Sequence, residues 1–391
     1  MVARDEKLCQ RGRRCYNRSM RVLLVSPYGA NVNPYINLLS DGLSAAGATV
    51  GATRLLTPDD LRSERRPDVV HLHWLEGYDA PPPLRPRASS ALLRAFERAT
   101  IRLSALPPAR DCRRQRRFDE LFALLTEFQR GGGRVAYTAH NLDPHETANA
   151  PELRALRAIM RVADVVHAHD RATADELARR FGRREGVRIV PHGHYQSAYP
   201  NEVTRADARA ALQIPQDAFV YVSVGLLRPY KGLEELLPAF RSLEDRNARL
   251  LVAGKAADPV YLDSLTALAA GDSRIRLEPR FVPGDELQLY FNAADIAVLP
   301  YRQITTSGAA MLAFSFGAPV VAPAIGAFSQ LLAEERGVLY EPGKLALALR
   351  RTRERKWGDA RPRILEWVRQ FDWTEIGRAL LSAYKQGGAS K

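Results

Sequence analysis

Residues 299–321 read Leu-Pro-Tyr-Arg-Gln-Ile-Thr-Thr-Ser-Gly-Ala-Ala-Met-Leu-Ala-Phe-Ser-Phe-Gly-Ala-Pro-Val-Val, and this stretch decides the fold. Aliphatic runs flank a polar turn and an apolar segment that Gly317 would end as a C-cap. The pattern predicts a strand, a turn, a helix and a second strand at Asp295–Leu299, Gln303–Gly308, Ala309–Phe316 and Pro319–Ala322. Such a turn leaves backbone N–H groups open at a helix N-terminus, where they can receive a phosphate.

The size and composition of the chain predict a globular protein with two domains. Its 391 residues exceed one ordinary core, and 46% apolar with 26% charged residues is typical of globular folds. No run of about 18 apolar residues occurs, and residues 1–19 lack the apolar centre of a signal peptide. The cysteines Cys9, Cys15 and Cys112 are too few for a disulfide framework and match no zinc signature, so a cytoplasmic protein is expected.

The net charge of +13 favours anionic partners such as lipid headgroups or phosphorylated substrates. Residues 85–118 hold ten arginines, and Ala91–Leu106 places arginines between apolar residues at helical spacing. Two interpretations of this basic helix stay open: its apolar face packs on the core, or it contacts an anionic surface at the inner face of the cell membrane. Nucleic acid is not expected as a partner, because no recognised binding motif accompanies the charge.

Strands rich in Val, Ile and Leu alternate with helical stretches in two series, which is typical of parallel sheets with crossover helices. The first series comprises Arg21–Ser26, Val69–His73, Arg134–Ala139, Asp164–His167 and Val187–Val190, and the second Phe219–Val224, Arg249–Ala253, Arg274–Leu277, Asp295–Leu299 and Pro319–Ala322. The fold class is therefore α/β with two Rossmann-like, doubly wound domains. The predicted organisation is a disordered extension at 1–19, an N-terminal domain at 20–195, a polar linker at 196–216, a C-terminal domain at 217–365 and a final helical segment at 366–391.

In the first half, candidate site residues follow the ends of strands, where open parallel sheets bind ligands. In Ser26–Asn31, Gly29 would let a ligand approach the backbone, although a simple strand-to-helix turn fits equally well. The segment Tyr137–Glu146 places two imidazoles, His140 and His145, with two carboxylates in one loop. An imidazole there can hydrogen-bond a reacting hydroxyl; metal binding is the alternative, but the spacing matches no zinc signature. Other strand-ending histidines are interpreted as structural or pocket-lining, and two near the linker could face a cleft: His71, His73, His167 and His169, then His192 and His194.

In the second half, the strand Phe219–Val224 runs into Gly-Leu-Leu-Arg-Pro-Tyr-Lys-Gly. Arg228 and Lys231 thus lie three residues apart between a strand and a helix, a spacing that can hold a diphosphate. The turn Thr306–Gly308 follows another strand of the same predicted sheet. Two loops of one sheet therefore direct phosphate-binding groups the same way, which predicts a diphosphate site.

From Met20 to the C-terminus the chain resembles GT-B glycosyltransferases of the family 4 group. Gly225–Gly232 resembles the loop whose Arg and Lys hold the donor diphosphate, and Asp295–Pro300 with Gly317–Val321 resembles the segment that frames the nucleotide sugar. The final helix around Trp373–Tyr384 resembles the segment that crosses back onto the first domain. The resemblance implies a GT-B architecture with two domains facing a cleft. It also implies hexosyl transfer, without metal or other cofactor, from a nucleotide-diphosphate sugar to a hydroxyl of a lipid-linked, polysaccharide or glycolipid precursor.

The resemblance also assigns site residues. Donor contacts are implied for Arg228, Lys231, Phe281, Val282, Thr305, Thr306, Ser307, Gly308 and Ala309, and acceptor contacts for Gly29 and Asn31. His140 falls where the family often has an active-site histidine. If the reaction inverts the anomeric carbon it needs a base, for which the candidates are His145, Glu146 and Asp143. No metal ligand is implied.

Two positions depart from the family pattern. The family usually carries two glutamates eight residues apart, associated with the donor sugar and the ribose, and the corresponding residues here are Thr305 and Ala313. The sugar and the stereochemical course therefore stay open. Two alternative functions of the same fold also stay open: a nucleotide-sugar epimerase and a non-catalytic nucleotide-sugar-binding protein.

Overall fold

The structure, a computed structural model, describes residues 19–28, 33–62, 64, 66–75, 78, 107–142 and 150–386, except the side chains of 107–110. Several predicted features lie outside these residues: most of the extension 1–19, the basic segment 85–106, and the candidates Gly29, Asn31, Asp143, His145 and Glu146. The chain divides into two compact units. The first contains residues 1–138, 149–166 and 377–391, and the second contains 139–148 and 167–376.

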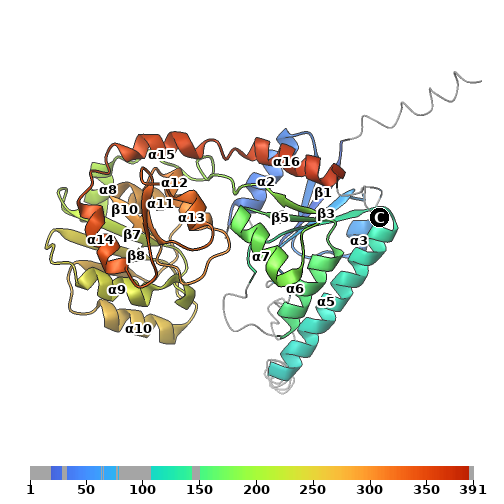
Figure 1. The fold of residues 1–391 in the computed structure, drawn as a ribbon, viewed down its shortest axis with the longest axis horizontal. Helices are drawn as coiled ribbons and strands as arrows, with labels where there is room; N and C mark the ends of the chain where they lie inside the picture. Colours follow the sequence, from blue (N-terminus) through green and yellow to red (C-terminus); the bar gives the residue numbers. More distant parts are fainter. Residues whose placement is uncertain are drawn as a thin grey trace, which may run out of the picture. The chain divides into compact units, whose positions relative to one another are not determined.

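The first sheet has six strands in the order β2-β1-β3-β4-β5-β6 (Figure 1). Its strands are β1 (Arg21–Val25), β2 (Thr49–Thr53), β3 (Val69–His73), β4 (Arg134–Thr138), β5 (Val165–Ala168) and β6 (Val187–Ile189). The connecting helices are α2 (Tyr35–Ala45), α3 (Pro58–Arg62), α5 (Pro107–Arg130), α6 (Ala150–Val162) and α7 (Arg171–Phe181). Strand β1 pairs in parallel with both β2 and β3, so the strand order reverses there as a doubly wound sheet requires.

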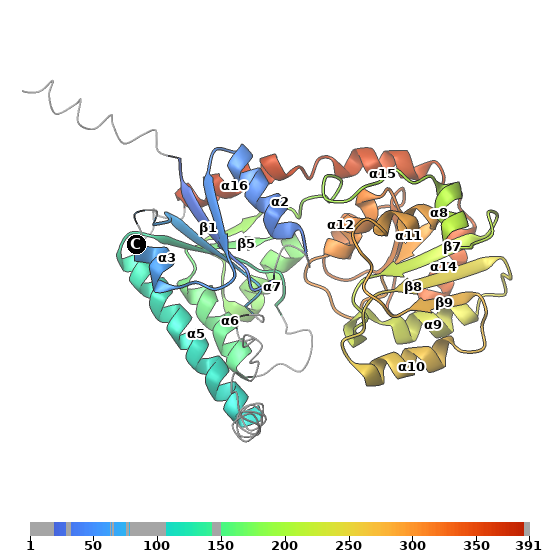
Figure 2. The ribbon, with the colours of Figure 1, turned by 180° about the vertical axis from the view of Figure 1, so that it is seen from behind.

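The second sheet is parallel throughout, with the order β12-β11-β10-β7-β8-β9. Its strands are β7 (Phe219–Val224), β8 (Ala248–Ala253), β9 (Ile275–Glu278), β10 (Ile296–Val298), β11 (Val320–Pro323) and β12 (Gly337–Tyr340). The helical segments are α8 (Arg205–Ala211), η3 (Pro229–Lys231), α9 (Leu233–Arg241), α10 (Pro259–Ala269), α11 (Leu287–Ala293), α12 (Gly308–Ser315), α13 (Phe328–Leu331), α14 (Leu345–Arg353), α15 (Ala360–Val368) and α16 (Trp373–Gln386). In both ribbon views, α9 and α10 cover one face of this sheet and α11, α12 and α15 the other (Figures 1 and 2).

The second sheet places its candidate ligand site between β7 and β10. These strands are parallel neighbours, with Ile296 paired to Tyr221, and the strand order reverses at this point. Ligands of doubly wound sheets bind in the crevice beyond the carboxyl ends of the strands at such a reversal. The loops that follow β7 and β10 are the two loops in which the sequence predicted phosphate-binding groups.

The predicted α/β fold class is confirmed, with two strands missed. The strands predicted at Val69–His73 and Phe219–Val224 have the observed bounds, and the predicted helix Ala309–Phe316 is α12, one residue earlier at each end. Gly317 follows α12 with φ 72°, the left-handed conformation expected just beyond a helix end. The missed strands are β2 and β12, at the edges of their sheets. Strand β2 reads Thr-Val-Gly-Ala-Thr and is largely exposed, so it lacks the apolar run on which strand prediction depends.

The linker predicted at 196–216 contains a helix, α8, anchored by a buried arginine. Arg209 is 1% exposed; its Nε donates to the Ala293 carbonyl at 3.0 Å, and its guanidinium pairs with Asp295 at 3.0 Å. Asp295 also accepts a hydrogen bond from the Val220 backbone at 2.8 Å. The sequence did not predict this helix, because an arginine in a polar stretch usually indicates exposure to solvent, whereas Arg209 is buried and paired with a carboxylate.

Replacing Arg209 with alanine is expected to lower the free energy of unfolding by about 3–5 kcal/mol, because it leaves Asp295 partly buried without its inner cation. Arg205 contacts the same carboxylate with a side chain that is 44% exposed, so Arg205→Ala should cost at most about 1 kcal/mol. Urea unfolding of both variants tests this. Equal losses for the two substitutions would show that the burial of Arg209 is not what stabilises α8 against the sheet.

Candidate functional site

The loop after β7 carries two cations beside an aromatic ring. Lys231 ends the short helix η3, and its Nζ lies 5.4 Å from the centroid of the Tyr301 ring. Gly225 has φ 131°, and a Cβ placed on it would lie 2.7 Å from the Lys231 Nζ. The absence of a side chain at Gly225 therefore gives the ammonium group its place above the ring. Arg228, three residues before Lys231, belongs to the same loop.

The loop after β10 packs directly on the loop after β7. The Arg302 backbone N–H donates to the Tyr230 carbonyl at 2.8 Å. Gly232 adopts φ 67°, and a Cβ there would lie 2.1 Å from the Pro300 carbonyl oxygen. Only glycine permits so close an approach of the two backbones in this conformation. The two loops predicted to share a ligand are thus held together at the point where the strand order reverses.

The turn after β10 leaves unused hydrogen-bonding groups at the start of α12. The Ser307 hydroxyl caps the helix by accepting from the Ala310 N–H at 3.0 Å. Within the described residues, the backbone N–H groups of Gly308 and Ala309 have no hydrogen-bond acceptor, and the buried Thr306 Oγ1 has no partner. Two N–H groups and one hydroxyl at a helix N-terminus form a ready anion site when cations lie in the adjoining loop.

Arg302, in the loop after β10, is paired with carboxylates, whereas Lys231, in the loop after β7, has no such partner among the residues that the structure describes. Arg302 forms ion pairs with Glu235 at 3.0 Å and Glu234 at 3.4 Å, both in the first turn of α9, and these hydrogen bonds and charges raise its pKa. Lys231 forms no ion pair with any carboxylate in the described part of the chain. Burial, together with the nearby charge of Arg228, lowers the pKa of Lys231 to about 8. Lys231 is therefore a cation that an anionic ligand would stabilise.

This pKa predicts how turnover should depend on pH. As the pH rises through about 8, Lys231 in the free enzyme loses its proton, so kcat/KM for an anionic donor should fall. An arginine at this position stays charged, so the Lys231→Arg variant should lose this fall. The comparison comes from kcat/KM of the two proteins measured between about pH 6.5 and about pH 9.5, which brackets the pKa of Lys231. Parallel decreases in both proteins would assign the titration to another group.

His140 lies in a line of buried imidazoles in the second unit. It is 6% exposed, and its ring centroid is 5.4 Å from that of His169. The His169 ring lies 5.1 Å from His192 and 4.4 Å from His167. A Cβ on Gly308 would lie 3.4 Å from the His192 Nε2, so this line leads from the loop after β4 to the start of α12. The structure thus connects His140 with the predicted phosphate turn through two histidines that the sequence did not assign to the site.

The inner imidazoles are neutral at physiological pH. Burial lowers the pKa of His192 to about 4 and that of His167 to about 4. The His192 Nδ1 lies 2.8 Å from the Gly193 carbonyl, to which only a protonated nitrogen can donate, and Nε2 then faces the Tyr195 hydroxyl at 3.4 Å. The sequence flagged His192 only by its place near the linker; its contact with Gly308 depends on tertiary packing.

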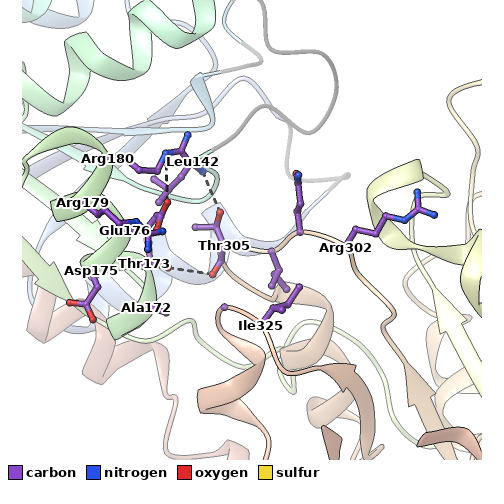
Figure 3. A pocket seen from close by; sticks show the side chains of 13 residues that line it. Leu142, Ala172, Thr173, Asp175, Glu176, Arg179, Arg180, Arg302, Thr305 and Ile325 are labelled. Atoms are coloured by element: carbon purple, nitrogen blue, oxygen red, sulfur yellow. Dashed lines mark hydrogen bonds and ion pairs between the residues drawn. The ribbon is translucent and has the colours of Figure 1, made fainter. Parts of the chain in front are cut away.

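Thr305 occupies a different place from the other predicted donor residues. Its Oγ1 accepts from the Leu142 N–H at 3.3 Å, and its carbonyl accepts from the Thr173 hydroxyl at 3.3 Å. Figure 3 shows Thr305 between these two residues at the edge of a cavity of about 550 Å³. Thr305 lines this cavity, whereas Arg228, Lys231 and residues 306–309 do not.

The remaining predicted residues differ in how far their side chains are exposed. Phe281 and Val282 follow β9 at the same carboxyl edge of the second sheet, with Phe281 56% exposed and Val282 buried. Ala313 is fully buried in α12, so it does not face open space as a ribose-contacting position would; its neighbour Leu312 is half-buried. The described residues contain no group of three or more His, Cys, Asp or Glu placed to hold a metal ion.

Comparison with known proteins matches both domains. Residues 218–354 match the family model of glycosyl transferases group 1. The chain is 30% identical over 302 residues to GDP-mannose:glycolipid 4-beta-D-mannosyltransferase of Xanthomonas campestris pv. campestris, covering 75% of this chain and 70% of that protein. It is 31% identical over 273 residues to D-inositol 3-phosphate glycosyltransferase 1 of Catenulispora acidiphila, covering 63% and 64%.

Two solved structures share the whole fold. Sucrose-phosphate synthase from Thermosynechococcus elongatus has a TM-score of 0.66 at 19% identity, and Anabaena HepE in complex with UDP and glucose has 0.66 at 17%. Each alignment covers 94% of this chain and 99% of the other. The similarity extends over both sheets.

Proposed function

The chain belongs to the group 1 glycosyltransferases and has the GT-B fold, and from this premise we propose that it transfers a hexose from a nucleotide-diphosphate sugar to a hydroxyl of a lipid-linked saccharide. The observation that supports the site assignment is the packing of the loops after β7 and β10. It holds the loop that carries Arg228 and Lys231 against the loop that leads into α12. These groups offer positive charge and N–H donors to one anion.

We propose that the reaction needs no bound metal. Charge develops on the diphosphate as the sugar leaves, and Arg228, Lys231 and the N–H groups of Gly308 and Ala309 can stabilise it. The Lys231 ammonium, whose pKa burial lowers, gains most from such an anion because binding restores a counter-charge. Turnover should then persist in a chelator such as EDTA.

His140 is proposed to hold a donor or acceptor hydroxyl. It lies at the end of a line of buried imidazoles that reaches Gly308, and an imidazole can donate a hydrogen bond to a sugar hydroxyl or accept one from it. His145 and Glu146 are proposed as bases for an inverting reaction, and Gly29 and Asn31 as acceptor contacts. These four residues lie outside the described part of the chain.

The glycolipid acceptor named for the Xanthomonas relative supports a lipid-linked acceptor here, and its GDP-mannose makes that sugar nucleotide the first donor to try. We propose that the enzyme acts in the cytoplasm, at the inner face of the membrane, through the basic segment 85–118 and the net charge of +13. Among the described helices, none is long and apolar enough to cross a bilayer.

A donor screen tests the proposed function. The protein is incubated with GDP-mannose, UDP-glucose or other nucleotide sugars, with and without octyl glycosides as acceptors and with EDTA present. Nucleoside diphosphate should appear only when an acceptor is present, together with a glycosylated product detected by mass spectrometry. An isomerised sugar nucleotide formed without acceptor would identify an epimerase, and no turnover with any donor would favour a binding protein.

A further inference from the structure

The cavity beside Thr305 is a second site in the second unit, separate from the cation loop. Helix α7 forms one wall with Thr173, Glu176 and Arg180, and the loop after β10 forms the other with Arg302 to Thr305. Figure 3 shows the α7 side chains on one side of Thr305 and Arg302 on the far side. At about 550 Å³ the cavity has the size of a small-molecule site.

The charged side chains that line this cavity are all paired, which makes the cavity a poorer diphosphate site than the loop after β7. Glu176 forms ion pairs with both Arg179 and Arg180, the second at 3.7 Å. Asp175 pairs with Arg171 at 2.9 Å. The two cations of α7 that border the cavity, Arg179 and Arg180, therefore share a carboxylate partner on the same helix, unlike Lys231 in the loop after β7.

Paired side chains of both charges suit a ligand rich in hydroxyl groups. A carboxylate oxygen can accept from a hydroxyl and a guanidinium N–H can donate to one, so paired Glu176 and Arg180 still offer both kinds of hydrogen bond. Leu142, Ile304 and Ile325 add apolar surface to the same cavity. A sugar ring presents hydroxyls at its edge and C–H groups on its faces, and it would match both.

The cavity also lies where an acceptor is needed. Thr305 lines it and immediately precedes Thr306, whose buried hydroxyl and following N–H groups belong to the proposed diphosphate site. A ligand in the cavity would thus lie beside the donor without displacing it. We propose that this cavity binds the saccharide of the acceptor and that Glu176 and Arg180 on α7 determine acceptor affinity, an inference that rests on the proposed transferase function.

Saccharide binding tests the proposal independently of turnover. Octyl glucoside, octyl mannoside and octyl cellobioside are offered to the full chain, and saturation-transfer NMR reports contact with their ring protons. At least one should bind, and Glu176→Ala should weaken it about tenfold or more, as expected for a lost hydrogen bond to a charged group. The exposed Arg184→Ala, just beyond α7 and outside the cavity, is the matched control and should bind normally.

Kinetics separate this site from the donor site. Glu176→Ala should raise the acceptor KM while leaving the donor KM and nucleoside diphosphate affinity within twofold. If Glu176→Ala does not fold, Ala172→Phe, which fills the cavity from the same helix, should have the same effect. Unchanged saccharide binding in these variants, or no binding to the wild type, overturns the proposal. A wild type that binds saccharides but transfers no sugar would instead contradict the proposed function.

Discussion

Replacing Lys231 with alanine should lower kcat/KM for sugar transfer by about 10²–10³-fold, the loss found when one preorganised donor to a developing anion is removed. Lys231 has no carboxylate partner among the described residues and lies between Gly225 and the Tyr301 ring, so its charge is available to a diphosphate. Arg228→Ala should cost a similar factor. Initial rates at varied donor concentration, with acceptor saturating, give the measurement.

The control for this prediction is Arg302→Ala. Arg302 lies in the adjoining loop, but Glu234 and Glu235 already bind its guanidinium, so at saturating acceptor its loss should change kcat/KM for the donor only a few-fold. Because Arg228 and Lys231 would act on one diphosphate, the double variant should lose less than the product of the single losses. A Lys231→Ala enzyme as active as the wild type would remove Lys231 from the site.

Replacing His140 with alanine should lower kcat by about 10²-fold or more while nucleoside diphosphate affinity stays near that of the wild type. We expect kcat to fall without a loss of nucleotide affinity because His140 lies at the far end of the imidazole line from α12 and does not belong to the loop that carries Arg228 and Lys231. Single-turnover rates and nucleotide binding, measured on the same preparation, give the two quantities.

The matched variant is His194→Ala, which removes a half-buried imidazole that follows the Gly193 turn. Its kcat should stay within a few-fold of the wild type. Equal losses of kcat in the two variants would indicate a general effect on the fold. A His140→Ala enzyme with normal kcat and weak nucleotide binding would place His140 at the donor phosphate.

The two strands whose predicted bounds agree with the structure are buried along nearly their whole length. Val69–His73 and Phe219–Val224 lie inside their sheets and are rich in valine and aromatic residues, which makes them recognisable in the sequence. The edge strand β2, Thr-Val-Gly-Ala-Thr, lacks these residues and was not predicted. Helix α8 was not predicted either, because its buried Arg209 looks like a surface residue in the sequence. Both failures come from contacts between distant residues, which a local pattern does not contain.

The arrangement of the loops at the candidate site was predictable for the same reason. The positions of Arg228, Lys231 and Thr306 at the ends of neighbouring strands follow from the alternation of strands and helices, and the structure joins their loops. The approach of His169 and His192 to His140 could not be predicted, because three separate segments of chain supply them. The burial of Ala313 likewise depends on which side of α12 faces the sheet.

Direct binding of nucleoside diphosphate tests the central claim, that Arg228 and Lys231 hold the donor diphosphate. Isothermal titration of GDP and UDP at pH 7, in EDTA, is performed with the wild type, the Arg228→Ala/Lys231→Ala double variant and Arg302→Ala. The wild type and Arg302→Ala should bind one of the two nucleotides with similar affinity, and the double variant at least about tenfold more weakly. Equal affinity of the double variant and the wild type would contradict the claim.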